Sequence, residues 1–405
     1  MLKRIQLHWQ ILIALVLSII FGITLPAYVE YVSWMGDVFL RALQMIIVPL
    51  IFSSIVSGVT GIGSGQNLGR MTLKTIGYYM TTSLFAIVTG LLLVNIIRPG
   101  VDADLGLSAN VEGLAASGDS FGQTLIKIIP TNIVESMVRG DLPSIIFFAI
   151  FFGFFATRVM PQYSDSVVNF FNGIFEIMMK ITLFVIKFTP LGVFGIVSAI
   201  VAENGDNLIA LFSSMGIYMI TVLGALFIHA FVTLPLLMKF IGKANPVKHA
   251  RNMSVPLLTA FSTSSSSATL PLTIESVEFK SGVSNKTTSF VLPLGATINM
   301  DGTALYQCIA VLFISQAYGV DLSIVQQFIV ILTALLASIG AAGIPMAGLV
   351  IISIILSAVG LPLEGVGLIL AVDRILDMVR TSVNVWSDSC GAVIIAKSEG
   401  ESTYV

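Results

Sequence analysis

Long apolar runs recur along this chain, and they leave few ways to fold it. A helix needs about 20 mostly apolar residues to cross a bilayer. With 56% hydrophobic and 10% charged side chains among 405 residues, the chain also has too little polar surface to coat a soluble globule. We therefore predict an all-α membrane protein, with apolar runs at about 10–27, 35–60, 75–97, 141–160, 166–188, 207–240, 287–317, 325–358 and 363–396.

The distribution of charge predicts how the chain is oriented. Segment 101–123 is rich in Gly, Ser and Asp and has no basic residue, which is typical of an extracellular loop. The positive-inside rule then places the N-terminus in the cytoplasm. The first run is interpreted as a retained helix, because no signal-peptide cleavage pattern follows it. The basic groups are Lys3/Arg4, Arg70/Lys74, Lys239–Arg251 and Lys280/Lys286.

Several functions are disfavoured by simple counts. A formal net charge of −2 argues against nucleic-acid binding. The two cysteines and three histidines lack the spacing of a disulfide framework or a zinc site. The serine run 264–267 has no neighbouring histidine and no strand–turn–helix elbow, so we predict that the protein is not an enzyme. An intramembrane hydrolase is the alternative, and a serine-reactive probe would detect it.

Two regions are predicted to enter the membrane and turn back. In 252–285 and 325–358, small residues interrupt apolar arms at FSTSSSSATLP (261–271) and ASIGAAGIPMAG (337–348). Each arm is about half a span long, and irregular backbone is tolerated at depth only where protein or a water-filled cavity satisfies it. Two re-entrant hairpins, each followed by a helix, indicate an inverted repeat with a binding site at the repeat interface.

The last apolar run carries polar side chains on one helical face. Charged groups inside a bilayer cost at least ~2.5 kcal/mol each, so they require partners other than lipid. Those partners are either one another, in a bundle lined by ion pairs, or a charged solute with cations, and we favour the solute. At about 100° per residue, Asp373, Asp377, Arg380, Thr381, Asn384 and Asp388 fall at about 0°, 40°, 340°, 80°, 20° and 60°.

The stripe predicts a substrate with both signs of charge. Arginine offers a planar donor fork to a carboxylate, and a carboxylate accepts from an ammonium, so Arg380 with Asp377 fits an acidic amino acid. The donors of Ser264–Ser267 suit its α-carboxylate, although a polar linker has the same composition. A C4-dicarboxylate carrier would not need Asp377, and a neutral amino-acid carrier would not need Arg380. A gated ion channel also uses broken helices, but it could not concentrate a solute.

A second motif predicts a cation site. NMDGT (299–303) breaks an apolar helix and frees backbone carbonyls beside Asn299 and Asp301, which suits an alkali cation. A kinked helix that satisfies its own backbone is the alternative. The hydroxyls of YYMTTS (78–83) by themselves indicate ordinary packing.

Four ordered motifs together resemble one known family. SSSSATLP (264–271), LPLGATINMDGTALYQ (292–307), ASIGAAGIPMAG and DRILDMVRTSVNVWSDSCGA (373–392) are similar to the glutamate/aspartate transporter family of dicarboxylate/amino acid:cation symporters, the homologues of the excitatory amino-acid transporters. The similarity spans essentially the whole chain. It implies a sodium-coupled symporter of aspartate and/or glutamate in the plasma membrane, with eight transmembrane helices and two re-entrant helical hairpins. It also implies a homotrimer with an elevator mechanism.

The resemblance further implies a division of the chain. A trimerisation scaffold would comprise 1–70 and 121–205, and a moving transport domain would comprise 71–100 and 206–405, with 101–122 as an extracellular loop. The later segment would contain hairpin 1 (about 245–285), the seventh helix (about 287–317), hairpin 2 as the gate (about 325–358) and the eighth helix (about 363–396).

Matching motif to motif, the resemblance implies a substrate site. Arg380 would bind the side-chain carboxylate and Asp377 the amino group, while Asn384 and hairpin 1 would bind the main-chain carboxylate. Arg374 departs from the family, because archaeal relatives commonly place this arginine in hairpin 1, and it is expected to form a neighbouring salt bridge. The implied substrate ligands are Ser265, Ser266, Thr303, Ile344, Gly348, Asp377, Arg380, Thr381 and Asn384.

The resemblance also implies three sodium sites. The third would use backbone groups and form only when hairpin 2 closes, which couples cation binding to gating. Gln307 stands where animal relatives carry a glutamate used in proton movement and potassium return, so we expect sodium coupling without potassium counter-transport. The implied ligands are Gly295, Asn299, Asn384 and Asp388 for the first site, Tyr79, Thr82, Ser83, Asn299 and Asp301 for the second, and Thr297, Met300, Ser338, Ile339 and Ala341 for the third.

Overall fold

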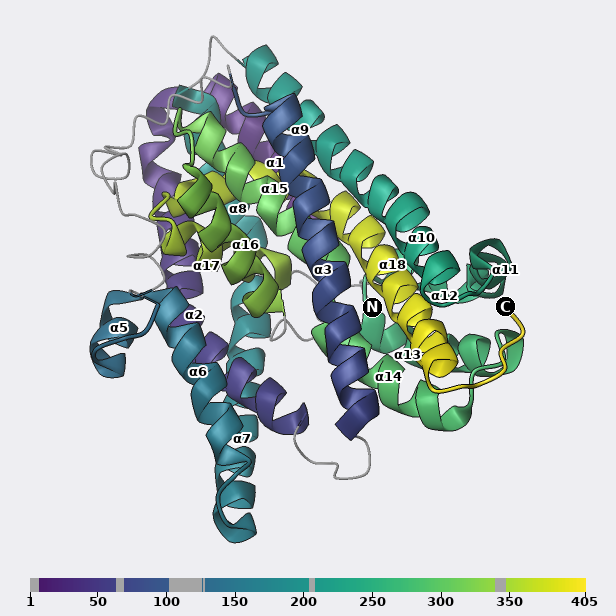
Figure 1. Ribbon diagram of the computed structural model, residues 1–405. Coiled ribbons are helices and arrows are strands. Elements are labelled where there is room, and N and C mark those ends of the chain that lie inside the picture. The colour runs from purple at the N-terminus through teal and green to yellow at the C-terminus, as the bar shows by residue number, and fades with distance from the viewer. Residues whose placement is uncertain (1–6, 63–68, 102–125, 127, 204–207, 339–346) are drawn as a thin grey trace, which may run out of the picture.

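The computed structural model of the protein describes residues 7–62, 69–101, 126, 128–203, 208–338 and 347–405, and these residues form helices and connections but no strand. Figure 1 shows their arrangement. The elements are α1 (Leu7–Thr24), η1 (Pro26–Tyr28), α2 (Glu30–Ile62), α3 (Gly69–Ile97), α5 (Ile133–Arg139), α6 (Leu142–Ala156), α7 (Pro161–Ile186), α8 (Thr189–Glu203), α9 (Leu208–Ile228), η3 (His229–Thr233), α10 (Leu234–Phe240), α11 (Pro246–Asn252), α12 (Ser254–Thr263), α13 (Ser266–Glu275), η4 (Ser276–Lys280), α14 (Asn285–Ile298), α15 (Asp301–Ala317), α16 (Ile324–Ser338), α17 (Ala347–Ala358), η5 (Leu363–Gly365) and α18 (Val366–Ser398).

The apolar runs of the sequence become membrane-length helices. Five stretches within the described residues are long and apolar enough to cross a bilayer. One of them joins α9, the π-helical turn η3 and α10 into a continuous helix, as the single run 207–240 predicts. The apolar helix α8 is missing from the predicted runs. The sequence of α8 contains a proline and two glycines among its first seven residues, and these interrupt the apolar pattern.

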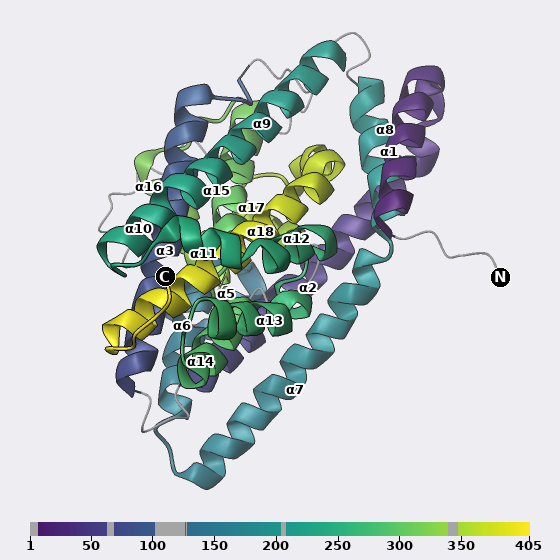
Figure 2. The ribbon, with the colours of Figure 1, turned by 90° about the vertical axis from the view of Figure 1, so that its right-hand side faces the viewer.

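The first half of the chain builds one group of helices. In it, α2 packs against α6, α7 and α8, while α1 lies along α8 (Figures 1 and 2). Glycines permit the close crossing of α2 and α8, since a Cβ added to Gly195 would lie 2.6 Å from the backbone nitrogen of Gly36. Small residues are the usual means by which membrane helices approach closely.

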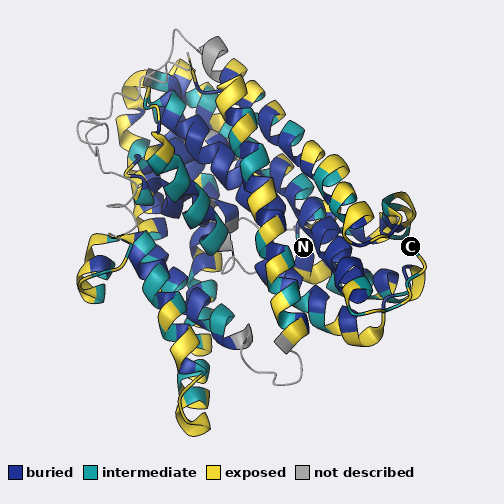
Figure 3. Cartoon of the chain, viewed as in Figure 1, coloured by how far each residue is buried: buried dark blue, intermediate teal, exposed yellow. Residues whose placement is uncertain are grey.

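A second group surrounds α15. This helix packs against α3, α9 and α18, and every one of its residues except Gln316 is buried. Its neighbour α18 also contacts α12 and α14. Figure 3 shows these inner helices as largely buried, whereas the outer helices expose one face. The polar stripe of α18 is therefore enclosed by protein rather than by lipid.

Both predicted hairpins occur as paired helical arms. In hairpin 1, α12 and α13 pack on each other and are separated by Ser264 and Ser265. Ser264 ends α12 with φ 51°, in the left-handed region that permits the sharp reversal. In hairpin 2, α16 and α17 also pack on each other. Residues 339–346 of its predicted tip, which include Ile339, Ala341 and Ile344, lie outside the described residues.

The last residues fold back over hairpin 1 and α3. Glu399 forms ion pairs with Arg70, at 2.7 Å, and with Lys74. Glu401 accepts hydrogen bonds from the hydroxyls of Ser284 and Thr287 at the start of α14. The chain end therefore connects three elements that are far apart in the sequence.

Candidate functional site

The helix predicted over about 287–317 is broken where the sequence predicts. Helix α14 ends at Ile298, and Asn299 is extended, with φ −93° and ψ 99°, before α15 begins at Asp301. Gly295, in the last turn of α14, faces α18. A Cβ added there would lie 2.5 Å from a carboxylate oxygen of Asp388. Glycine thus allows the broken helix to contact the carboxylate directly.

Arg380 is the centre of the polar stripe. Its guanidinium donates to Asp377 Oδ1 at 2.8 Å, lies 3.1 Å from Asp373 Oδ1 and stacks 3.8 Å over the ring of Tyr306. The side chain is 1% exposed. Arg374, which is 27% exposed, lies 3.6 Å from Asp377 Oδ2. The expected neighbouring salt bridge of Arg374 is therefore present.

This cluster keeps unused hydrogen-bonding capacity. Within the described part of the chain, Asp377 Oδ2 and Arg380 Nε are buried and have no hydrogen-bond partner. Gly348 of α17 faces the same guanidinium, since an added Cβ would lie 3.0 Å from Arg380 Nη1. An acceptor for an ammonium and a donor for a carboxylate are thus present together under hairpin 2.

Asn384 joins the stripe to the broken helix. Its Oδ1 accepts from the backbone nitrogen of Gly302 at 2.8 Å, and its Nδ2 donates to Thr303 Oγ1 at 3.1 Å. Both contacts lie in the first turn of α15. One turn earlier on α18, the Thr381 hydroxyl donates to the carbonyl of Asp377. The predicted substrate ligands Thr303, Asp377, Arg380, Thr381 and Asn384 are thus brought together by two helices.

The predicted hairpin 1 serines lie at the tip of that hairpin. Ser265 caps α13, accepting from the backbone nitrogen of Ala268, and Ser266 is buried in the first turn. Both arms of the hairpin, α12 and α13, pack on α18, the helix that carries the stripe. The role of both serines toward a substrate stays a prediction.

A second cluster surrounds Asp301, which is fully buried. One carboxylate oxygen accepts from the hydroxyls of Ser83 at 2.6 Å and Thr82 at 3.3 Å. The other accepts from Ser387 at 2.6 Å and lies 3.1 Å from His229 Nε2. The YYMTTS motif thus faces Asp301 and is not ordinary packing alone. Tyr79 also lies here, although its hydroxyl donates to the carbonyl of Val291.

Asn299 links this cluster to Asp388. Its Nδ2 donates to Asp388 Oδ1 at 2.8 Å and to Ser387 Oγ at 3.0 Å, while its Oδ1 is buried without a partner among the described residues. Carboxylate, amide and hydroxyl oxygens therefore converge around the break. Such hard oxygen donors suit sodium. Groups of three or more His, Cys, Asp or Glu side chains, which would suit a transition metal, are absent from the described residues.

The ligands predicted for the third cation site are only partly visible. Met300 is buried at the break, Thr297 is exposed on α14, and Ser338 ends α16. Ile339 and Ala341 lie outside the described residues, so this site stays a prediction.

Three residues that contact the two clusters are not predicted from the sequence. Ser387 lies at about 320° on the helical wheel, next to Arg380, and the same projection could have included it. Tyr306, which donates to Asp373 at 2.7 Å, and His229 come from other helices. No pattern within their own segments distinguishes them from packed residues.

The fold and these two clusters define a multi-pass helical membrane protein that encloses a charged site beside a broken helix. The chain matches the sodium:dicarboxylate symporter family over residues 7–398, and it belongs to that family. It is 36% identical to the proton/glutamate-aspartate symporter of Escherichia coli, over 98% of this chain and 93% of that protein. Identity is also 36% to the proton/sodium-glutamate symport protein of Geobacillus stearothermophilus, over 99% and 96%. The mouse excitatory amino acid transporter 3 is 36% identical over 96% of this chain and 85% of its own length.

Proposed function

We propose that this protein is a sodium-coupled secondary active symporter for acidic amino acids, aspartate and/or glutamate. The observation that carries the proposal is the buried Arg380, paired with two carboxylates while Asp377 Oδ2 has no hydrogen-bond partner among the described residues and only the longer 3.6 Å contact with Arg374. An acidic amino acid supplies both matching groups, a carboxylate for Arg380 and an ammonium for Asp377. The names of the relatives support the same substrates.

Substrate binding exchanges partners around Arg380. The side-chain carboxylate takes guanidinium donors, and the ammonium then neutralises Asp377. The main-chain carboxylate is bound by Asn384 and by the hairpin 1 tip at Ser265 and Ser266. Thr303, Thr381, Ile344 and Gly348 complete the pocket.

Sodium binds at Asp301 and Asp388 and organises the break between α14 and α15. Both carboxylates are buried, so a cation removes the cost of an uncompensated charge. The cation site and the substrate site are linked through residues that are adjacent in the sequence. Asp301 begins α15, while Gly302 and Thr303, the next two residues, contact Asn384. Ordering this turn with sodium therefore positions a substrate ligand, which is the basis of coupling.

The remaining steps follow from the two helix groups. Hairpin 2 acts as the gate, since α17 lies against Arg380. The group around α15 and α18 acts as the transport domain of an elevator, and the group of α1, α2, α6, α7 and α8 as its scaffold within a homotrimer. We place this assembly in the plasma membrane with the N-terminus in the cytoplasm. Neutralised charges lower the barrier for moving the loaded site.

The test is aspartate uptake into proteoliposomes under an inward sodium gradient. Arg380→Ala is expected to abolish concentrative uptake, whereas Arg98→Ala, which removes a surface ion pair with Asp321, leaves it unchanged. Undiminished uptake by Arg380→Ala would disprove the substrate assignment. A proton gradient without sodium forms a further arm, and full uptake there would replace sodium with protons as the coupling ion. Competition by succinate distinguishes a C4-dicarboxylate carrier.

A further inference from the structure

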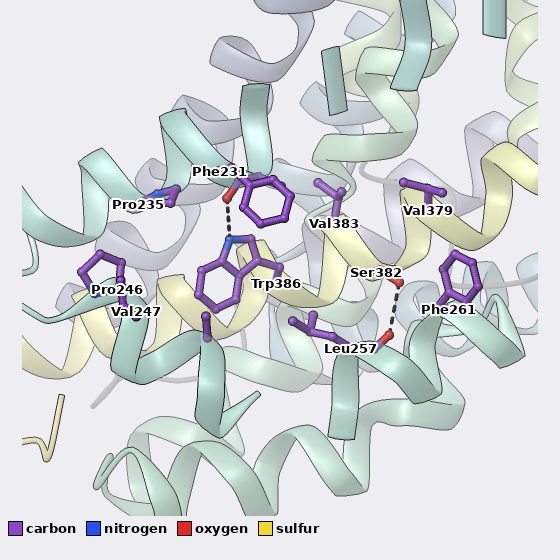
Figure 4. A pocket seen from close by; sticks show the side chains of 12 residues that line it. Phe231, Pro235, Pro246, Val247, Leu257, Phe261, Val379, Ser382, Val383 and Trp386 are labelled. Carbon is purple, nitrogen blue, oxygen red and sulfur yellow. Dashed lines mark hydrogen bonds between the residues drawn. The ribbon is translucent and has the colours of Figure 1, made fainter. Parts of the chain in front are cut away.

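A cavity opens on the face of α18 that points away from the polar stripe. Its volume is about 510 Å³, and it lies between η3 and α10 on one side and α11 and α12 on the other (Figure 4). The α18 residues that line it, Val379, Ser382, Val383 and Trp386, fall at about 180–280° on the wheel that places the stripe between about 340° and 80°. The cavity is therefore distinct from the substrate and cation clusters.

The cavity offers almost nothing to a polar ligand. Its lining is apolar except for Ser382 and the indole nitrogen of Trp386. Both groups are already satisfied, since Ser382 donates to the carbonyl of Leu257 and Trp386 Nε1 donates to the carbonyl of Ala230 at 3.0 Å. Figure 4 shows both bonds. A ligand that fills this space must bring hydrocarbon.

The segment that lines one side of the cavity also carries positive charge. Pro246, Val247 and Ala250 line the cavity, while the exposed Lys243, Lys248 and Arg251 lie within three residues of them in the sequence. Residues 239–251 contain no acidic residue.

These basic side chains form no ion pair with a carboxylate side chain among the described residues. Lys248 donates to the carbonyl of Tyr404, and neither Lys243 nor Arg251 has a carboxylate partner within the described residues. Lys243 also has φ 48°, where glycine would be favoured, so the backbone does not explain a lysine there. Positive charge is thus concentrated beside an apolar cavity, and among the described residues Lys243 and Arg251 have no carboxylate partner to neutralise it.

We infer that this cavity binds an anionic phospholipid, with an acyl chain between α11, α12 and α18 and the phosphate on Lys243 and Arg251. Apolar side chains at the cavity and beside it are exposed on the surface: Phe231 is 67% exposed, Phe240 is 70% exposed and Val247 is 62% exposed. A ligand can therefore enter sideways from the bilayer. Basic residues beside a membrane attract anionic lipids. Because α12 is an arm of hairpin 1, the bound lipid holds that arm against α18.

Trp386 makes the inference directly measurable. The chain has three tryptophans, so Trp9→Phe combined with Trp34→Phe leaves Trp386 as the only one. The variant is reconstituted in phosphatidylcholine vesicles with increasing fractions of phosphatidylglycerol brominated on its acyl chains, which quenches tryptophan on contact. Brominated phosphatidylcholine serves as the neutral probe. We expect saturable quenching by the anionic probe at a fraction about 30-fold below that needed with the neutral one, since each of two cations contributes about 1 kcal/mol, or about fivefold.

Two further variants separate a site from general lipid contact. Lys243→Gln/Arg251→Gln should remove the preference for the anionic probe, while the matched pair Arg139→Gln/Lys187→Gln, on the other helix group, should retain it. Ala250→Phe fills the cavity and should reduce quenching by both probes. Quenching that rises in proportion to brominated lipid whatever the headgroup, or that survives loss of both cations, would overturn the inference. Because the readout is binding, it does not depend on whether the transport proposal holds.

Discussion

The ammonium partner offers the sharpest test of the substrate site. Asp377→Asn keeps the side-chain volume and the acceptor that Arg380 uses, but it removes the negative charge. In the native protein Asp377 Oδ1 accepts from Arg380 at 2.8 Å, and Oδ2 has no hydrogen-bond partner among the described residues. The ammonium of an amino acid would donate a hydrogen bond to this oxygen. Succinate has no ammonium, so it gains nothing from Asp377.

The size of the effect follows from the bond that is lost. A hydrogen bond to a charged group contributes about 1.5–3 kcal/mol, which corresponds to about 10- to 150-fold in Kd. We expect the Kd of aspartate to rise by this factor in Asp377→Asn. Affinity for succinate should stay constant or improve, because Arg380 then faces one negative charge fewer.

The assay is a pair of sodium-dependent binding titrations in detergent, one for each ligand. Asp321→Asn is the matched control, since that carboxylate is 81% exposed and, among the described residues, forms its one ion pair with Arg98 at the surface. Its affinities should equal those of the native protein. If Asp377→Asn weakened aspartate and succinate by the same factor, the loss would be structural and the ammonium assignment would fail.

Three other predictions follow from the described contacts. Asp301→Asn removes the charge beside Ser83, so aspartate binding should need at least tenfold more sodium, and an unchanged sodium titration would refute this cation site. Gly348→Ala places a Cβ about 3.0 Å from Arg380 and should weaken aspartate binding about tenfold without lowering thermal stability, as binding and melting curves would show. Hydrogen bonds from Arg70 and Lys74 lower the pKa of Glu399 to about 2, so its stabilising effect is present above about pH 4.5 and is lost as the pH falls toward 2. Glu399→Gln should therefore lower the Tm slightly at pH 7, less so in high salt, and not at pH 2.

Patterns within single segments predict much of the site. The period of a helix places Asp377, Arg380, Asn384 and Asp388 on one face, and all four are buried together. The small-residue break of hairpin 1 predicts the reversal at Ser264. These features depend on residues close in sequence, so elementary geometry is sufficient.

Pairings between distant segments could not be predicted in the same way. Ser83 and Asp301 are 218 positions apart, and only the packing of α3 on α15 brings them together. The hydroxyls of α3 therefore resemble ordinary packing until the family resemblance supplies a partner. His229 and Tyr306 are not predicted for the same reason, because the carboxylate that each of them contacts lies on another helix. Helix α8 is not predicted for a local reason. Its glycines allow close packing, but they lower the apolar character of its sequence.

The folded-back C-terminus has a consequence for how the protein is made. Lys74 and Glu399 are separated by 325 positions. At about 5–20 residues per second, a ribosome needs roughly 16 to 65 s to travel between them. During that interval α3 has been synthesised, while its partners α15 and α18 have not yet been completed. Thr82 and Ser83 therefore lack the carboxylate to which they later donate hydrogen bonds. The cluster around Asp301 therefore gains Ser387, its last described hydrogen-bond donor, only when α18 has been made, and until then the polar groups of α3 lack their partners.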